Sequence, residues 1–234
     1  MKTVVVTGAT GGLGSNLVKQ LNKDYDVVCV YRNQRKFDEI FWDGKNLKQH
    51  LTNNEDDFST LSAKIDTPDE IILVLNAFAI EPIKTIGTYT AKEIEDMTDG
   101  NIKQTVMIIN ELVGLADKNN VALRIINIDS GAADFPLKGW GNYCASKAYV
   151  NAFLAVVASE HANIKIVSVD PGVMDTKMQE SIRATDVAVF DKVNDFKNYK
   201  DTGVLRQPCD VAKYIIEKYI DEWKANALRE KIVL

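Results

Sequence analysis

Apolar and polar positions follow two periods along the chain, one typical of strands and the other of helices. Short apolar runs rich in β-branched residues predict strands buried on both faces. These runs lie at 2–7, 26–31, 40–42, 70–75, 122–128 and 164–169, with a last strand at 231–234. Apolar residues spaced three and four apart predict helices at 13–22, within 55–65, at 90–119, at 142–161 and at 208–223. Strands that alternate with helices favour an α/β fold, a doubly wound parallel sheet with helices on both faces.

Three stretches depart from this regular alternation. Residues 32–39 are short and polar. Because a crossover usually needs about ten or more residues, we expect the helix there to be reduced to a turn or missing. Thr90 is a candidate cap for the long helix, and Gly100 marks an interruption within it. Residues 171–199 have weak periodicity and many charges. No internal repeat or linker divides the sequence, so we predict one domain over 1–234.

Composition narrows the class of protein. The 234 residues are 46% hydrophobic and 26% charged, which is typical of a soluble α/β domain. A net charge of −5 argues against a nucleic-acid surface, and no apolar run is long enough to span a bilayer. No separate signal segment precedes the first strand. Cys29, Cys144 and Cys209 lie far apart without metal-ligand spacing. We therefore expect free thiols, no metal and a cytoplasmic location.

A glycine-rich turn, Thr7-Gly-Ala-Thr-Gly-Gly-Leu-Gly14, follows the first predicted strand and opens the first predicted helix. Gly8 permits the tight turn, Gly12 lets a pyrophosphate approach the backbone, and Gly14 allows close helix–sheet packing. The helix N-terminus offers unpaired amides to phosphates. The alternative is an ordinary glycine-rich turn. The context of strand, glycine spacing and helix favours a dinucleotide site.

Arg32 stands at the end of the second predicted strand, where no Asp or Glu occupies positions 30–33. An NAD site usually has a carboxylate there for the ribose hydroxyls, whereas an arginine accommodates the 2′-phosphate of NADP. The alternative is a solvated arginine after a strand. Asp43 either accepts a hydrogen bond from the adenine amino group or serves as a turn residue.

Ser130 follows the fifth predicted strand, and Tyr143 and Lys147 lie four residues apart on a predicted helix. That spacing places the phenol and the ammonium on one face. At about 4 Å and an effective dielectric near 20, their attraction is roughly 4 kcal/mol, or about three pKa units. Lys147 is therefore expected to lower the pKa of Tyr143 so that it can exchange a proton with a carbonyl oxygen held by Ser130. The alternatives are an exposed Tyr/Lys pair and a serine turn.

Taken together, these motifs resemble the short-chain dehydrogenase/reductase family over nearly the whole chain, which implies a Rossmann-type fold. The resemblance rests on the glycine turn, Asn76-Ala77, Asn101, Ser130, Tyr143, Lys147 and the segment from Pro171 to Thr176. It implies a catalytic tetrad in which Asn101 positions a proton-relay water, Ser130 orients the carbonyl and Tyr143 donates the proton. Lys147 would bind the nicotinamide ribose. The implied cofactor-binding residues are Gly8, Thr10, Gly12, Leu13, Gly14, Arg32, Asp43, Asn76, Ala77, Tyr143, Lys147, Pro171, Gly172, Val173 and Thr176.

Within the family, the sequence is similar to the sepiapterin reductase and benzil reductase branch. Three positions depart from the family pattern. Phe78 stands where a glycine is usual after the fourth strand, beside the expected nicotinamide, and Gly11 stands where many NADP-dependent members carry a basic residue. Lys177 replaces the acidic residue that anchors the pterin in sepiapterin reductases. The last difference favours a diketone-like substrate over a pterin.

We therefore predict an NADPH-dependent carbonyl reductase that acts on a ketone or dicarbonyl. One alternative is a dinucleotide-binding sensor or scaffold without useful catalysis; another is a sepiapterin-type pterin reductase. A nucleotide-sugar epimerase or dehydratase would need a larger region after Pro171. The expected partners are a small-molecule substrate and further copies of the chain, with no nucleic acid and no membrane. The resemblance implies a homodimer or homotetramer formed through the helices near 90–119 and 142–161.

Overall fold

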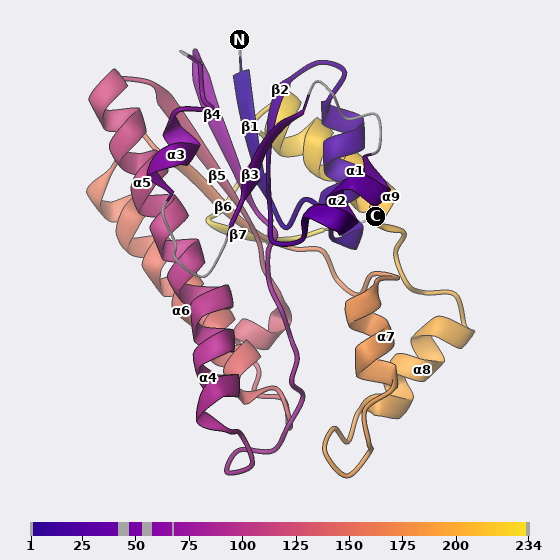
Figure 1. The fold of residues 1–234 in the computed structure, drawn as a ribbon. Helices are drawn as coiled ribbons and strands as arrows, with labels where there is room; N and C mark the ends of the chain where they lie inside the picture. Colours follow the sequence, from indigo (N-terminus) through magenta and orange to yellow (C-terminus); the bar gives the residue numbers. More distant parts are fainter. Residues whose placement is uncertain (1, 42–46, 53–57, 67, 233–234) are drawn as a thin grey trace.

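The computed structural model describes residues 2–41, 47–52, 58–66 and 68–232. Its centre is a parallel sheet with the strand order β3-β2-β1-β4-β5-β6-β7 (Figure 1). The strands are β1 (Lys2–Thr7), β2 (Asp26–Tyr31), β3 (Lys48–Leu51), β4 (Glu70–Leu75), β5 (Ala122–Ile128), β6 (Lys165–Asp170) and β7 (Arg229–Lys231). The order reverses between β1 and β4, so the predicted doubly wound sheet is confirmed.

Helices cover both faces of this sheet (Figure 1). The helices α1 (Gly12–Leu21), α2 (Gln34–Ile40) and α9 (Pro208–Ile215) lie on one side. The helices α3 (Ser59–Ser62), α5 (Gln104–Asn119) and α6 (Gly141–Glu160) lie on the other. The helices α4 (Ala91–Thr98), α7 (Lys177–Arg183) and α8 (Val193–Asp201) extend beyond the carboxyl ends of the strands. The edge of the sheet at which the strands end thus has α4 on one side and α7 and α8 on the other (Figure 1).

Alternating side chains on the central strands build the two layers of the core. In β1, Val4 and Val6 pack with α1 and α9, whereas Val5 faces the opposite cluster with α5 and α6. All three side chains are fully buried. Since burying such a side chain contributes roughly 1.5–3 kcal/mol, strands buried on both faces account for the continuous apolar runs in the sequence.

The secondary structure of the connection after β2 differs from the prediction. Residues 34–40 form the helix α2, which was expected to be reduced to a turn or missing. The side-chain oxygen of Asn33 caps it by accepting a hydrogen bond from the Lys36 amide at 2.9 Å. Phe37 anchors it by stacking on Tyr31, with ring centroids 4.3 Å apart. A side-chain cap and one buried aromatic ring therefore stabilise a helix of only seven residues.

The third strand was also predicted in the wrong place. Ile40 ends α2, Trp42 lies outside the described residues, and β3 instead pairs with Val28–Tyr31. This edge strand carries Lys48, whose ammonium contacts the Asp26 carboxylate at 2.8 Å. Its polar composition suits an edge strand but gives no apolar run that would reveal it.

Elsewhere, the observed helix boundaries agree better with the boundaries predicted from the sequence. Thr90 caps α4 through a capping box with Glu93, as predicted. The interruption near Gly100 is a π-helical segment, Asp99–Lys103, between α4 and α5. The final predicted strand is only partly tested because residues 233 and 234 lie outside the described part of the chain. The structure places β7 at Arg229–Lys231.

The glycine turn between β1 and α1 depends on close backbone contact. Gly8 has φ +62°, and a Cβ atom on Gly14 would lie only 2.2 Å from the Gly8 carbonyl oxygen. The nearest atom belongs to the backbone, so the turn cannot accept a methyl group at Gly14 unless the backbone at Gly8 moves.

We predict that Gly14→Ala destabilises the protein by about 1–3 kcal/mol, the usual cost of overpacking. Gly114→Ala is the matched control, because nothing lies within 4 Å of a Cβ atom at that position of α5. The control should gain about 0.5–1 kcal/mol from helix propensity. Urea unfolding measures both changes, and equal unfolding free energies for the two variants would contradict the close packing of the turn.

Candidate active site

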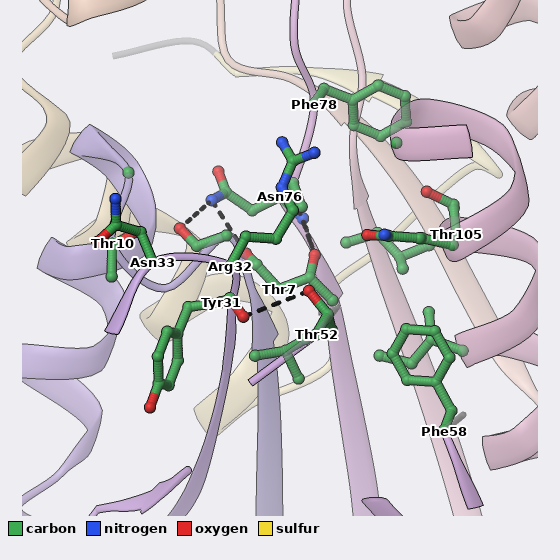
Figure 2. A pocket seen from close by; sticks show the side chains of 18 of the residues that line it. Thr7, Thr10, Tyr31, Arg32, Asn33, Thr52, Phe58, Asn76, Phe78 and Thr105 are labelled. Carbon is green, nitrogen blue, oxygen red and sulfur yellow. Dashed lines mark hydrogen bonds between the residues drawn. The ribbon is translucent and has the colours of Figure 1, made fainter. Parts of the chain in front are cut away.

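A cavity opens at the carboxyl ends of β1, β2 and β4, where the strand order reverses (Figure 2). Its volume is about 400 Å³, which lies within the usual range for small-molecule sites. Five of the predicted cofactor-binding residues line it: Gly8, Thr10, Arg32, Asn76 and Ala77. The structure therefore brings the glycine turn and the end of β2 together in one cavity.

Hydrogen bonds join the two segments of the cavity wall that follow β1 and β4. The side-chain amide of Asn76 donates to the carbonyl oxygens of Thr7 (3.1 Å) and Gly8 (3.2 Å). In return, the Thr7 hydroxyl oxygen accepts from the amides of Asn76 (2.9 Å) and Ala77 (3.0 Å). Asn76 thus fixes the glycine turn against β4, a role that its place in the sequence motif did not indicate.

The first turn of α1 suits a phosphate group. Gly11 is its N-cap, and within the described residues no side chain caps the helix and no acidic residue occupies the first turn. The first turn therefore offers unpaired amides and a partial positive charge. Gly11, its N-cap, lines the cavity, whereas Gly12, Leu13 and Gly14 do not. Leu13 contributes no side chain there, because it is 3% exposed and packs in the core. The backbone of this turn, rather than its side chains, fits a pyrophosphate.

Two cationic side chains line the cavity near the end of β2. Arg32 reaches across the cavity, since its Nη1 atom would lie 3.2 Å from a Cβ atom on Gly100. It forms no ion pair with any described residue. Lys36, in the first turn of α2, also lines the cavity. Lys36 was not among the predicted site residues, because the helix there was expected to be reduced to a turn or missing. Asn33 followed by an amphipathic segment was the available signal.

The loop after β6 reaches the other side of the glycine turn. A Cβ atom on Gly12 would lie 2.9 Å from the methyl carbon of Thr176. Gly172 has φ +71°. The Arg206 guanidinium donates to the Pro171 carbonyl oxygen at 3.0 Å and so supports this loop. Thr176 is therefore beside the predicted pyrophosphate site. Val173 lies in the same loop, whereas Asp43 lies outside the described residues.

Asn101 lies in the π-helical segment and is 1% exposed. Its side chain donates to the carbonyl oxygen of Ala79 and accepts from the amide of the same residue, both at 2.8 Å. The Thr105 hydroxyl donates to the Asn101 carbonyl oxygen at 2.8 Å. The side chain therefore holds the segment after β4 against α5. A π-helical segment at this point fits the tendency of such segments to occur at functional sites.

Ser130 and Tyr143 meet in the structure. The side-chain hydrogen bond from Ser130 lowers the pKa of Tyr143, but burial raises it more, so the pKa of this phenol is above its ordinary value. Tyr143 is 6% exposed, and Trp140 packs edge-on against it with ring centroids 5.8 Å apart. At neutral pH the phenol therefore keeps its proton.

Lys147 is 2% exposed and does not act on Tyr143 as the spacing predicted. Its ammonium donates to the Ile128 carbonyl oxygen at 2.5 Å and lies 3.3 Å from the Phe78 ring centroid. The Tyr143 ring centroid is 5.9 Å away. Burial lowers the pKa of Lys147 to about 7 despite the opposing carboxylates of Asp129 and Asp170. The predicted lowering of the Tyr143 pKa is therefore wrong: burial raises it.

An ion pair between the buried Asp129 carboxylate and the exposed Arg229, next to Ser130, was not predicted. Asp129 accepts hydrogen bonds from Arg229 Nη2 at 2.8 Å and from the Asn151 side chain at 3.0 and 3.1 Å. Arg229 also contacts Asp134 at 2.7 Å, so it joins β7 to both sides of the Ser130 loop. Asp129 and Arg229 are 100 positions apart, and no local pattern in the sequence links them.

Comparison with known proteins agrees with this geometry. A family model described as short chain dehydrogenase matches residues 2–187. The chain is 31% identical over 225 residues to a benzil reductase ((S)-benzoin forming) of Bacillus subtilis, covering 91% of this chain and 90% of that protein. It is 29% identical over 120 residues to bovine sepiapterin reductase, covering 50% and 45%. A serine dehydrogenase solved in its closed form with NADP+ has a TM-score of 0.78 at 23% identity, covering 98% of this chain and 94% of that one.

The chain therefore belongs to the short-chain dehydrogenase family, a family of oxidoreductases. The predicted resemblance to its benzil and sepiapterin reductase branch is confirmed by these relatives. Among the described residues, no helix is long and apolar enough to cross a membrane. The same residues contain no group of three or more His, Cys, Asp or Glu side chains that could hold a metal ion.

We predict that Lys147→Met changes stability in a pH-dependent way. The pKa of Lys147 falls from 10.5 to about 7 on folding, so stability from this group is lost as pH decreases towards 7. Removing the ammonium should therefore stabilise the protein by a few kcal/mol at about pH 6, and this gain should shrink as the pH rises to about 10. Urea unfolding at several pH values measures it. Lys118→Met, at an exposed position of α5, is the control; the same pH slope in both variants would contradict the prediction.

Proposed function

We propose that this protein is an NADPH-dependent carbonyl reductase that reduces a ketone or dicarbonyl, with Tyr143 as the proton donor. The Ser130 side chain beside the buried Tyr143 phenol, with the buried Lys147 one turn further along α6, is the observation that carries this proposal. The similarity to benzil reductase supports carbonyl reduction.

The residues around the cavity fit a nicotinamide dinucleotide. The unpaired amides of α1 suit its pyrophosphate, and the two cations Arg32 and Lys36 suit a 2′-phosphate. Thr176 lies beside the same turn. When bound, the cofactor supplies the hydride. NADP+ in the structurally similar serine dehydrogenase supports the choice of NADP.

The chain itself supplies orientation and a proton. Ser130 would hold the carbonyl oxygen by a hydrogen bond, and Tyr143 Oη would give its proton to that oxygen as negative charge develops there. Tyr143 carries the proton for this step at neutral pH, because burial raises the pKa of the phenol. Asn101 would fix the π-helical segment, while Lys147 would contact the nicotinamide ribose.

Aromatic side chains surround the proton donor. Trp140 stacks on Phe190 with centroids 4.9 Å apart and packs against Phe196 at 5.7 Å, and Tyr143 belongs to the same buried cluster. These buried rings exclude water from the Tyr143 phenol, and the similarity to benzil reductase supports an aryl-substituted carbonyl compound as the substrate. Lys177, the first residue of α7, provides no carboxylate for a pterin.

A cytoplasmic homodimer or homotetramer remains part of the proposal. The support is apolar side chains exposed on two of the helices expected to form the interface: Ile94 on α4 is 47% exposed and Val156 on α6 is 51% exposed. Sedimentation equilibrium measures the assembly, and a monomer at micromolar concentration would contradict this part of the proposal.

Tyr143→Phe should lower kcat by about 10²- to 10⁴-fold, the usual contribution of a positioned proton donor. NADPH affinity should stay nearly unchanged because only the hydroxyl is removed. Benzil and other dicarbonyls serve as test substrates, with NADPH consumption as the readout. Tyr149→Phe is the control, since Tyr149 is 46% exposed on the same helix. If the wild-type protein binds NADPH but consumes none with any dicarbonyl, the alternative of a non-catalytic sensor would replace this proposal.

Arg32→Ala and Lys36→Ala should each reduce the preference for NADPH over NADH in kcat/KM by about ten- to a hundredfold, which corresponds to one lost charge-assisted hydrogen bond. The effect should be smaller at moderate salt because exposed charges are screened. Arg35→Ala is the control: Arg35 lies between them in sequence but pairs with Glu39 and is outside the cavity. A cofactor preference that is unchanged in both test variants would refute the phosphate site.

A further inference from the structure

Phe78 occupies the boundary between the cavity and the catalytic side chains. Its ring lines the cavity (Figure 2), and its centroid lies 3.3 Å from the Lys147 ammonium. Among the described residues, the cavity wall includes Phe78 but not Ser130, Tyr143 or Lys147. The ring therefore separates the nucleotide-sized space from the residues that the proposed reaction requires.

The Lys147 ammonium is enclosed in this arrangement. The lysine is 2% exposed, with its Nζ atom donating to Ile128 and covered by the Phe78 ring. A cation over an aromatic face is stabilised more strongly when it is desolvated. The Ile128 carbonyl and the Phe78 ring are thus the partners of the Lys147 amine in the protein without a ligand, and Lys147 does not line the cavity.

The backbone around Phe78 is fixed on both sides. The amide of Ala77 donates to the Thr7 hydroxyl at 3.0 Å. Ala79 exchanges two hydrogen bonds of 2.8 Å with the Asn101 side chain. Phe78 itself is only half-buried. A ligand that needs Lys147 must therefore displace the Phe78 side chain by rotation, because moving the backbone would break these bonds.

We propose that Phe78 is a gate whose ring covers Lys147 in the cofactor-free protein and turns away when the dinucleotide binds. This inference rests on the proposed function, because the occupant is the nicotinamide end of NADP(H). The contact stabilises the closed state, so it should lower the dinucleotide affinity by about two- to thirtyfold.

The closed state is tested in the protein without cofactor. Aromatic ring current should shift the NMR signals of the Lys147 side-chain methylene groups upfield in protein labelled with ¹³C-lysine, with Lys147→Arg identifying those signals. Phe78→Leu should lose the shift. Phe153→Leu should keep it, because Phe153 is a half-buried phenylalanine on α6 that stacks on Tyr149. Lys147 signals without a shift in the wild-type protein would overturn the covered state.

Opening is tested by adding NADP+. Saturating NADP+ should move the wild-type Lys147 signals towards their positions in Phe78→Leu. The titration itself uses the wild-type protein, and Lys147→Arg serves only to assign the signals. By calorimetry, Phe78→Leu should bind NADP+ about two- to thirtyfold more tightly than wild type, and Phe153→Leu should bind it equally.

Two results would overturn the gate. The first is a Lys147 signal that stays upfield with NADP+ bound, and the second is an NADP+ affinity that is unchanged or weaker in a folded Phe78→Leu protein. A wild-type protein that binds neither NADP+ nor NADPH would instead refute the proposed function and, with it, the opening step. The spectrum without nucleotide would still decide the contact between Phe78 and Lys147.

Discussion

Hydrogen bonds between Thr7 and the Asn76-Ala77 segment join the ends of the two central strands, β1 and β4. In a parallel sheet all strands end at one edge, so the loops that follow them must share that space. The Thr7–Asn76 contacts fix the glycine turn in the space between those loops. The cavity, the first turn of α1 and the position of Phe78 all depend on this connection. Asn101 extends it by binding Ala79 to the π-helical segment.

The balance between burial and charge decides the protonation states of Tyr143 and Lys147. An ammonium about 4 Å from a phenol would attract its charged form by roughly 4 kcal/mol at an effective dielectric near 20. In the structure, burial dominates instead: it raises the pKa of Tyr143 and lowers that of Lys147 to about 7. The Ile128 carbonyl and the Phe78 ring take the place that a phenolate or ribose would occupy beside the ammonium. The protein alone therefore favours a protonated Tyr143.

Most of the fold was predictable because its signals are local. A β-branched run such as Val4–Val6 needs burial on both faces, and only the centre of a parallel sheet provides it. The edge of the sheet was harder to predict, since β3 has a polar sequence. It is a strand because it pairs with β2, and the Lys48–Asp26 contact supports that pairing. The helix α2 was missed for a related reason. Its stability comes from Phe37 stacking on Tyr31, which counting residues in the connection does not reveal.

The candidate site, too, has features that follow from the local sequence and others that depend on long-range contacts. Motif spacing placed the glycine turn and Arg32 at the ends of the first two strands, and the structure brings both to one cavity. It also placed Ser130 and Tyr143 close together, as the structure has them. The spacing of Tyr143 and Lys147 fixed the helix face that they share, but not the direction of the lysine side chain. That direction depends on Ile128, 19 positions earlier in the sequence, and on Phe78 from another strand end. A four-residue spacing thus establishes that two groups can interact, and the long-range neighbours that bury them determine whether they do.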